Sequence, residues 1–479
     1  MRRKLVRDIG LALLAAPAFL HAAEVISIGS TPQLFVDDYL VESMTELERT
    51  FHRPRKYSGN PVLTGPEPWE NWVTEVYGRP VVYDEQAAEF RMYYGAPNVD
   101  ETAARGYHYK VGYAVSKDGL HWTKPRLRLV EWQGSLDNNL LPWGENWMRR
   151  PNVMIDPHDV DPARRYKMTY VDVIGGRSAI TKAYSPDGTH WSLNGDGKPW
   201  FRRYHSGNLL GWDPRIRKYV FYVRMPGRPN SVGRSVSSDF VTWSQPETVL
   251  APAPEDGGKD FKGLAAFLYG DLYLGWVWLF DHNQTAEAEL VVSRDGIRWK
   301  RISPGYNLFP RGAPGAWDSK MVLPNAPVVW NQRIWIYYAG WNIPYTRQAL
   351  KKTHEGWIEA GQRMQRAGGV ATLRLDGFAS LDTGARTGSL TTRPLLLAGN
   401  KLLVNAAVRG ELRVEMLDEN NEVLPGFEAA ACIPVHSDSL QHEIRWGASL
   451  GIDSLRGRPV KLRFILRDGS LYSFRCAAR

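Results

Sequence analysis

The chain has 479 residues, of which 43% are hydrophobic and 12% aromatic, so it carries enough apolar surface for two or three packed domains. This composition excludes an intrinsically disordered protein, and two cysteines are too few for a small disulfide-stapled scaffold. The 60 basic and 51 acidic residues give a mild formal net charge of +9. The arginines are scattered and no known nucleic-acid-reading motif is present, so no nucleic-acid partner is expected.

The first 23 residues have the pattern of a secretory signal peptide. Arg2, Arg3 and Lys4 precede an apolar run at 9–20, and small residues follow at 22–23. The run is too short to span a membrane stably, and no other segment reaches that length. The sequence therefore predicts a secreted or periplasmic protein without a membrane partner.

A short phrase of sequence returns along the rest of the chain. Serine, aspartate, glycine and tryptophan recur at 116–122, 185–191 and 293–299, with a variant at 238–243 and a shortened copy at 375–378. The aspartates of successive copies are 69, 52, 56 and 81 positions apart, which suits one four-stranded sheet with its loops. Five copies predict an all-β fold with a five-bladed β-propeller over residues 30–384.

Each predicted blade begins with two strands that are separated by turn-forming residues such as Asp-Pro or Asn-Gln. The strands are rich in β-branched and aromatic residues, which suits sheets that are buried on both faces. The first strands are expected at 79–83, 152–155, 208–212, 263–269 and 326–330, and their partners at 90–95, 166–171, 219–224, 272–279 and 334–340.

The repeated phrase itself has a structural explanation. Its aspartate carboxylate caps a tight turn, its glycine takes a positive φ angle, and its tryptophan packs between neighbouring blades. These aspartates are therefore assigned to the scaffold rather than to catalysis.

Two stretches depart from the repeat. Residues 345–366 mix apolar and charged residues in a way that predicts an amphipathic helix inserted in the fifth blade, either at the rim of a site or as a surface decoration. Residues 385–479 contain short alternating segments separated by turns, which predicts a C-terminal β-sandwich that supports the propeller or binds sugar. Cys432 and Cys476 both lie there, and the sequence leaves open whether they form a disulfide.

The candidate site lies where the inner strands begin, because these ends of all blades converge on one central funnel. Acids, bases and aromatic residues alternate there, which suits a carbohydrate: aromatic faces stack on sugar C–H faces and charged groups bind hydroxyls. Glu75, Asp260 and Asp318 are the catalytic candidates. The substrate-binding candidates are Arg79, Trp147, Arg149, Arg150, His205, Lys262, Trp317 and Lys320.

Glycoside hydrolysis gives these carboxylates a physical test. It needs two carboxyl groups beside one bond, about 5–5.5 Å apart for retention or about 6.5–9.5 Å for inversion. The alternative is that each candidate is a loop carboxylate paired with a nearby arginine. Asp37 and Asp38 are second-rank candidates. No cofactor is expected, although a histidine on the propeller axis is compatible with a structural metal ion.

Segments of the first and last predicted blades carry a family resemblance. The segments are 60–63 and 78–84 in the first blade, 317–321, 327–329 and 335–338 in the last, and an opening at 34–40. The blade segments resemble the β-mannoside phosphorylases, which belong with invertases and arabinanases to the clan of propeller glycosidases. The opening at 34–40 resembles a group of exported bacterial invertase-like proteins. The resemblance implies a five-bladed propeller that acts on carbohydrate. It transfers no catalytic residues, because the Asn-Asp-Pro-Asn, Glu-Cys and Glu-Asp-Pro-Arg signatures of these enzymes are absent.

The leading hypothesis is an exported glycoside hydrolase that acts on oligo- or polysaccharide fragments through a carboxylate pair in the propeller funnel. The alternatives are a non-catalytic glycan-binding propeller and a glycoside phosphorylase. Sialidase-like chemistry is disfavoured, because the repeated phrase is one residue shorter than an Asp box and sialidases need six blades. The sugar, the linkage and the glycosyl acceptor are not set by the sequence.

Overall fold

The computed structural model describes residues 25–70, 74–98, 108–142, 149–174, 177–193, 199–202, 204, 206–281, 285–343, 366–447 and 452–477. This part of the chain is all-β and forms several sheets, with short 3-10 turns at η1 (Pro162–Arg164), η2 (Pro254–Asp256) and η3 (Ile452–Leu455). The predicted signal peptide at 1–23 lies outside the described residues, and so does nearly all of the predicted insertion at 345–366.

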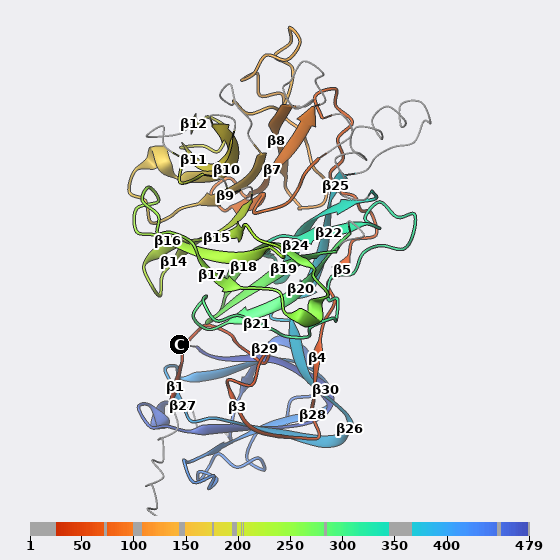
Figure 1. Cartoon of the computed structure of the whole chain (residues 1–479). Coiled ribbons are helices and arrows are strands. Elements are labelled where there is room, and N and C mark those ends of the chain that lie inside the picture. The colour runs from red at the N-terminus through yellow and green to blue at the C-terminus, as the bar shows by residue number, and fades with distance from the viewer. Residues whose placement is uncertain are drawn as a thin grey trace, which may run out of the picture.

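Most of the chain between 55 and 374 folds into successive antiparallel meanders, in which most strands pair with the next one along the chain (Figure 1). The last two meanders are joined into one sheet by a single parallel pair, Ala286 with Met321. The strands of the successive meanders are β6 (Val81–Asp84), β7 (Glu89–Asn98) and β8 (His108–Ser116); β9 (Arg149–Ile155), β10 (Tyr166–Ile174), β11 (Arg177–Ser185), β12 (Ser192–Leu193) and β13 (Phe201–Arg202); β14 (Gly207–Asp213), β15 (Lys218–Met225), β16 (Ser231–Ser237) and β17 (Glu247–Leu250); β18 (Asp260–Tyr269), β19 (Leu272–Phe280), β20 (Ala286–Ser293) and β21 (Lys300–Arg301); and β22 (Met321–Pro324), β23 (Val328–Trp330), β24 (Arg333–Trp341) and β25 (Arg366–Arg374), with β5 (Arg55–Lys56) at the edge.

The predicted strand pairs are confirmed, with one correction in the last meander. Its inner strand, predicted at 326–330, is split into β22 and β23, which both pair with β24. Asn325 lies in the break, where its side chain accepts a hydrogen bond from the Gly78 amide and donates one to the Val76 carbonyl, both at 3.0 Å. The Asn325 side chain therefore binds the segment 76–78, which precedes the first meander.

Residues that precede the first meander also complete the last one. Lys56 of β5 pairs with Ala371 of β25, and Leu63 forms an isolated bridge with Gly368. The Thr74 amide donates to the carbonyl of Arg366, the first residue of β25, at 2.8 Å. The beginning and the end of the meander series are thus joined without a covalent link.

The repeated phrase forms the predicted turns in its first four copies. Each aspartate carboxylate accepts hydrogen bonds of 2.7–2.9 Å from the backbone amides two and three residues later. Glycine follows with a φ of +70° to +85° in three copies, and Phe240 takes its place at +60° in the fourth. The four aspartates are Asp118, Asp187, Asp239 and Asp295.

The fifth copy differs from the others. Asp376 accepts a hydrogen bond from the Tyr269 hydroxyl at 2.7 Å and from the Ser473 hydroxyl at 2.6 Å. Its carboxylate therefore connects β18 with the C-terminal sheet instead of capping its own turn. It remains a scaffold residue.

The tryptophans of the phrase pack between neighbouring meanders, as predicted. The Trp191 ring lies edge-on to Tyr93 of the preceding meander, with centroids 5.9 Å apart. Trp122 makes the same contact at 5.7 Å with Tyr337 of the last meander, and the Tyr337 hydroxyl donates to the Gly119 carbonyl at 3.0 Å. The last meander therefore contacts the first through the same tryptophan–tyrosine packing by which the first contacts the second.

A second repeated contact between meanders was missed in the sequence. A tyrosine near the start of one meander's second strand donates its hydroxyl proton to a buried aspartate at the end of the preceding inner strand. The sequence pattern had indicated all three of these aspartates only as turn formers. The pairs are Tyr166 with Asp84, Tyr219 with Asp156 and Tyr273 with Asp213.

The C-terminal region forms a seven-stranded sheet that includes strands from near the N-terminus (Figure 1). The predicted division at 384–385 falls inside one continuous strand, and residues 33–51, which were expected in the propeller, pair with this sheet. The strands are β26 (Ala379–Thr392), β28 (Lys401–Leu417), β29 (Asp438–Ile444), β30 (Lys461–Ala477), β2 (Gln33–Leu34), β3 (Val41–Thr45) and β4 (Glu48–Phe51), and beside them β1 (Ile26–Ile28) pairs in parallel with β27 (Leu395–Leu397).

Both cysteines lie in the core of this region. Cys432 and Cys476 are buried free thiols among its apolar side chains, so they do not form the disulfide that the sequence left open.

The capped turns predict a specific loss of stability in acid. Burial raises the pKa of the Asp187 carboxyl, but hydrogen bonds from the His190 and Thr189 amides outweigh it and hold the pKa well below its usual range. A carboxyl with a lowered folded-state pKa stabilises the fold above its unfolded pKa of about 3.9, and this contribution disappears as the pH falls toward the folded value. Asp187→Asn should lower the free energy of unfolding by about 1 kcal/mol at pH 6, since the group is half-exposed and partly screened.

Urea unfolding at pH 6 and at about pH 3 tests this. The difference between wild type and Asp187→Asn should shrink at the lower pH, because the carboxyl of the unfolded chain is then mostly protonated while that of the folded protein is still ionised. An equal difference at both pH values would contradict the assignment.

Candidate functional site

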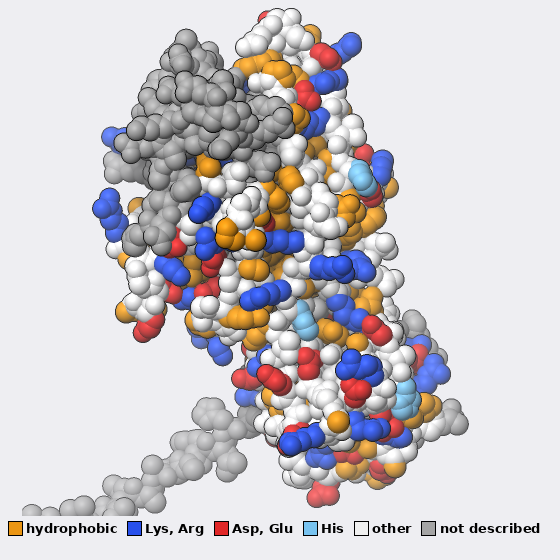
Figure 2. Space-filling model, turned by 90° about the vertical axis from the view of Figure 1, so that its right-hand side faces the viewer, with side chains coloured by type: hydrophobic (Ala, Val, Ile, Leu, Met, Phe, Trp, Pro, Cys, Tyr) orange, Lys and Arg blue, Asp and Glu red, His pale blue; other side chains and the backbone are white. Residues whose placement is uncertain are grey.

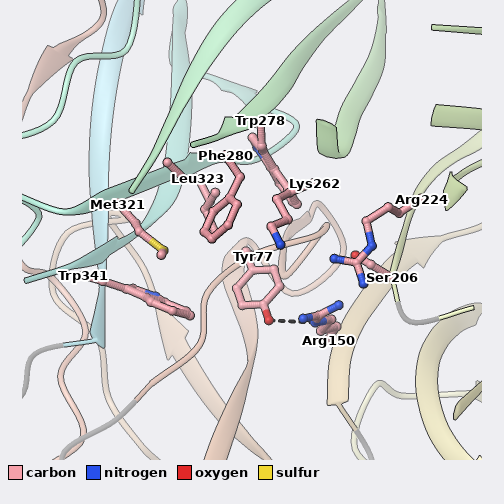
Figure 3. Close-up of a pocket in the computed structure, with 11 residues that line it drawn as sticks. Tyr77, Arg150, Ser206, Arg224, Lys262, Trp278, Phe280, Met321, Leu323 and Trp341 are labelled. Carbon is pink, nitrogen blue, oxygen red and sulfur yellow. Dashed lines mark hydrogen bonds between the residues drawn. The ribbon is translucent and has the colours of Figure 1, made fainter. Parts of the chain in front are cut away.

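The beginnings of the inner strands meet at one pocket (Figure 3). One residue from or just before the inner strand of each successive meander lines it, which agrees with the expectation that these ends share a cavity. The pocket holds about 410 Å³ of space, part of it open to solvent. The five residues are Tyr77, Arg150, Ser206, Lys262 and Met321.

The ends of the second strands line the same pocket. Antiparallel pairing places the end of a second strand beside the beginning of the inner strand, as in the pair of Asp260 with Phe280 and that of Met321 with Trp341. Arg224 reaches the pocket in the same way from β15. Sequence reasoning considered only the inner strands, so it missed these three side chains, although their positions at the strand ends were the available signal.

The pocket has two chemically different walls (Figure 3). Arg150, Arg224 and Lys262 extend into it from one side, together with the Ser206 hydroxyl. The rest of the lining is apolar and aromatic, and is made of Phe280, Met321, Leu323 and Trp341, with Trp278 beside Lys262. The two walls meet at Lys262, whose Nζ lies 3.8 Å from the centre of the Phe280 ring.

Backbone irregularities place two of the cations. Lys262 is the extra residue of a β-bulge, since Phe261 pairs with Leu279 and Gly263 with Trp278, the next residue along. A bulge turns a side chain away from its regular direction and is common beside active sites. Arg150 has a φ of +55°, a left-handed conformation that costs a non-glycine residue about 1–2 kcal/mol. The fold therefore tolerates strain at Arg150.

A chain of polar contacts runs behind the pocket from Arg150. Its Nε donates to the Tyr77 hydroxyl at 2.7 Å, and that hydroxyl donates to Glu75 Oε2 at 3.2 Å. The other carboxylate oxygen, Glu75 Oε1, forms an ion pair with Arg366 Nη1 at 2.9 Å. The Arg366 guanidinium lies 3.9 Å from the centre of the Trp341 ring, so the chain returns to the aromatic wall.

Of the three predicted catalytic carboxylates, Glu75 is thus directly bonded to a residue of the pocket. Asp318 is buried elsewhere, where it forms an ion pair with Lys56 at 2.6 Å and accepts a hydrogen bond from the Tyr338 hydroxyl at 3.1 Å. Asp260 begins β18, and its Oδ1 accepts a hydrogen bond from the Asn230 amide at 2.7 Å. No carboxylate is found among the described residues that line the pocket.

Some of the predicted substrate-binding residues line the pocket and others do not. Arg150 and Lys262 line the pocket, whereas Arg149 is half-buried at the start of β9. Trp317 stacks on Tyr338 with ring centroids 5.5 Å apart. The side chain of Lys320 is exposed, while its backbone bonds to Trp341 and Ala286. Trp147 and His205 lie outside the described residues.

Arg79 lies just before β6, but its side chain reaches Leu210 of β14 and does not line the first pocket. It donates a hydrogen bond to the Leu210 carbonyl, and burial lowers its pKa to about 10. With His158 and Trp212 it lines a second cavity of about 840 Å³. That cavity is larger, but its other walls are mostly aliphatic, proline and aromatic side chains, so the first pocket offers more groups for chemistry.

The described residues contain no group of three or more histidine, cysteine, aspartate or glutamate side chains arranged to hold a metal ion. None of their helical segments is long and apolar enough to cross a membrane.

The strain at Arg150 predicts an unusual order of stability. Arg150→Gly and Arg150→Ala both remove the guanidinium and its bond to Tyr77, but alanine keeps the unfavourable left-handed conformation and glycine does not. The glycine variant should therefore be the more stable by about 1 kcal/mol, the reverse of the usual order in a strand. Urea unfolding measures the difference, and a more stable alanine variant would show that the strain is absent.

No family model matches the chain, and no curated protein matches its sequence. The chain has a limited similarity to several solved structures. A glycosyl hydrolase from Bacteroides ovatus is 15% identical with a TM-score of 0.47, covering 68% of this chain and 94% of that chain. A glycoside hydrolase of the GH130 mannoside phosphorylase family, which targets β-1,2-mannosidic linkages in Candida mannan, is 15% identical with a TM-score of 0.45, over 68% and 94%. The β-1,2-mannobiose phosphorylase from Listeria innocua is 13% identical with a TM-score of 0.49, over 68% and 97%.

Proposed function

We propose that the protein is an exported glycoside hydrolase that acts on oligo- or polysaccharide fragments at the pocket where the inner strands begin. In this proposal the meanders are the blades of a five-bladed β-propeller, and the C-terminal region is a β-sandwich that supports it. The observation that carries the proposal is the contact of Glu75 with Tyr77, which joins a buried carboxylate to a pocket with one polar and one aromatic wall.

The two walls match the two surfaces of a sugar. A pyranose presents C–H groups on its faces, which pack well against aromatic rings such as Trp341 and Phe280. Its hydroxyls accept hydrogen bonds from cationic side chains such as Arg224 and Lys262, and a serine hydroxyl both donates and accepts. A sugar ring placed between the walls would satisfy both.

The chemistry is assigned to a carboxylate pair. Glu75 reaches the pocket through the Tyr77 hydroxyl, so it is placed to accept a proton that passes through that hydroxyl, as a general base must. Asp260 is proposed as the second carboxyl group, because it lies opposite Phe280 of the aromatic wall. Asp318 is assigned to the scaffold, since its ion pair with Lys56 lies outside the pocket lining.

A glycoside phosphorylase is the second candidate, and a specific observation favours it. The cationic wall offers Arg150, Arg224 and Lys262, which are the side chains that bind phosphate best. Incubation with an oligosaccharide panel, with and without inorganic phosphate, separates the two reactions. Free reducing sugars without phosphate indicate hydrolysis, and sugar 1-phosphates that form only with phosphate indicate phosphorolysis. Binding without any product would indicate a glycan-binding protein.

Glu75→Gln tests the catalytic assignment. Turnover should fall by at least about 100-fold, the contribution of a general acid or base. The free energy of unfolding should also fall by about 3–5 kcal/mol, because the variant leaves Arg366 buried without its partner. The double variant Glu75→Gln/Arg366→Gln removes that charge, so it should recover stability without recovering turnover.

Asp318→Asn is the matched control, because it also breaks a buried ion pair but lies away from the pocket. It should lose stability and keep most of its turnover when assayed well below its melting temperature. Loss of turnover in Asp318→Asn with normal turnover in Glu75→Gln would contradict the proposal.

A further inference from the structure

Three cationic side chains share the pocket. On the face seen in Figure 2, lysine and arginine side chains are interspersed with acidic ones. In the pocket, three cationic side chains extend from one wall, and the described lining residues include no acid. A neutral sugar needs hydrogen-bond donors and acceptors in similar number, so a wall with three cations is more than it requires.

The charge is built into the fold. Arg150 occupies a strained left-handed conformation and Lys262 a β-bulge, and both irregularities direct cations into one cavity. Strain that persists in a structure tends to mark functional positions. Regular strands at these two positions would direct the side chains differently, so the convergence is not a by-product of the sheet.

A fourth cation lies behind the aromatic wall. Arg366 is 3% exposed and packs on the pocket residue Trp341. Its Nη1 binds Glu75, while its Nε and Nη2 have no hydrogen-bond partner in the structure. Buried donors without a partner are costly, so Arg366 is a further buried cation that the fold retains next to the pocket.

We propose that the pocket binds a sugar that carries an anionic substituent, a carboxylate or a sulfate, with this substituent toward Arg150, Arg224 and Lys262. The inference rests on the proposed function and narrows its substrate class to acidic glycans. The sugar ring would lie against Trp341, and the anionic oxygens would accept charge-assisted hydrogen bonds from the cationic wall, where Lys262 Nζ lies over the Phe280 ring.

The proposal does not require the three cations to be otherwise free. Each of them has further interactions in the structure. Arginine and lysine have several donors, so each can keep an existing contact and still bind an anion. Because the pocket is partly closed to solvent, the attraction of their charges is screened less than on an open surface.

Matched pairs of ligands test the proposal on the full-length protein. One pair is a galacturonate trisaccharide and its carboxyl-reduced form, and the other is a sulfated galactose trisaccharide and its desulfated form. Calorimetry should show that one acidic member binds at least about tenfold more tightly than its neutral form. This preference should weaken as the salt concentration rises. The ligand pair that shows the preference identifies the anionic group as a carboxylate or a sulfate. Equal affinity within both pairs would overturn the proposal.

Amino-acid substitutions test whether the pocket cations cause the preference for acidic ligands. Lys262→Met and Arg224→Met should each remove most of it, while Lys218→Met should keep it. Lys218 is an exposed lysine at the far end of β15, so it changes the net charge equally without touching the pocket. A preference that survives in the two pocket variants, or that is lost equally in Lys218→Met, would place the anion elsewhere and overturn the proposal.

Product analysis on the same ligands separates this inference from the proposed function. Charge-dependent binding without cleavage would uphold the acidic ligand and reject the hydrolase. Cleavage of the neutral trisaccharides that depends on Glu75, with no preference for charge, would uphold the hydrolase and reject the acidic ligand. Phosphate-dependent cleavage of neutral sugars would reject both, because the cations would then serve phosphate.

Discussion

The ion pair between Glu75 and Arg366 connects the closure of the meander series with the pocket. Glu75 precedes the first meander and Arg366 begins the last strand of the series, and the two groups are 2.9 Å apart in a buried environment. Buried ion pairs contribute little net stability, since desolvation offsets most of their attraction, and an apolar pair could hold the same closure. The second carboxylate oxygen of Glu75 accepts a hydrogen bond from the Tyr77 hydroxyl, a contact that an apolar side chain at position 75 could not make.

The antiparallel pairing of the meanders determines which side chains can reach the pocket. Inner strands begin and second strands end on the same side, so each meander offers two sets of side chains there. Regular alternation would turn some of them away. The bulge at Lys262 and the left-handed residue Arg150 correct the direction locally, and the capped turns and tyrosine–aspartate contacts elsewhere hold the sheets around them.

Local patterns in the sequence were sufficient for much of the fold. The repeated phrase predicted the capped turns and the meanders, because turn chemistry depends on residues that are neighbours in the chain. The rule that inner strands begin at one place found Arg150 and Lys262. The division at 384–385 was misplaced, since nothing local shows that β26 continues through it or that β2, β3 and β4 pair with the C-terminal strands.

Local sequence patterns could not identify ion-pair partners that are far apart in the chain. Glu75 and Arg366 are 291 positions apart, and Asp318 and Lys56 are 262 apart. Before the fold is known, the two carboxylates look alike: both lie just ahead of an inner strand. What distinguishes them is the contact of Glu75 with Tyr77, a residue just ahead of the inner strand that was not among the sequence candidates.

The most direct test of the account is a crystal structure of the protein with an oligosaccharide that it binds. The account predicts the sugar between the cationic and aromatic walls, in contact with Tyr77, Lys262 and Trp341. A sugar bound instead in the cavity beside Arg79 and Trp212, or on the C-terminal sheet, would contradict it.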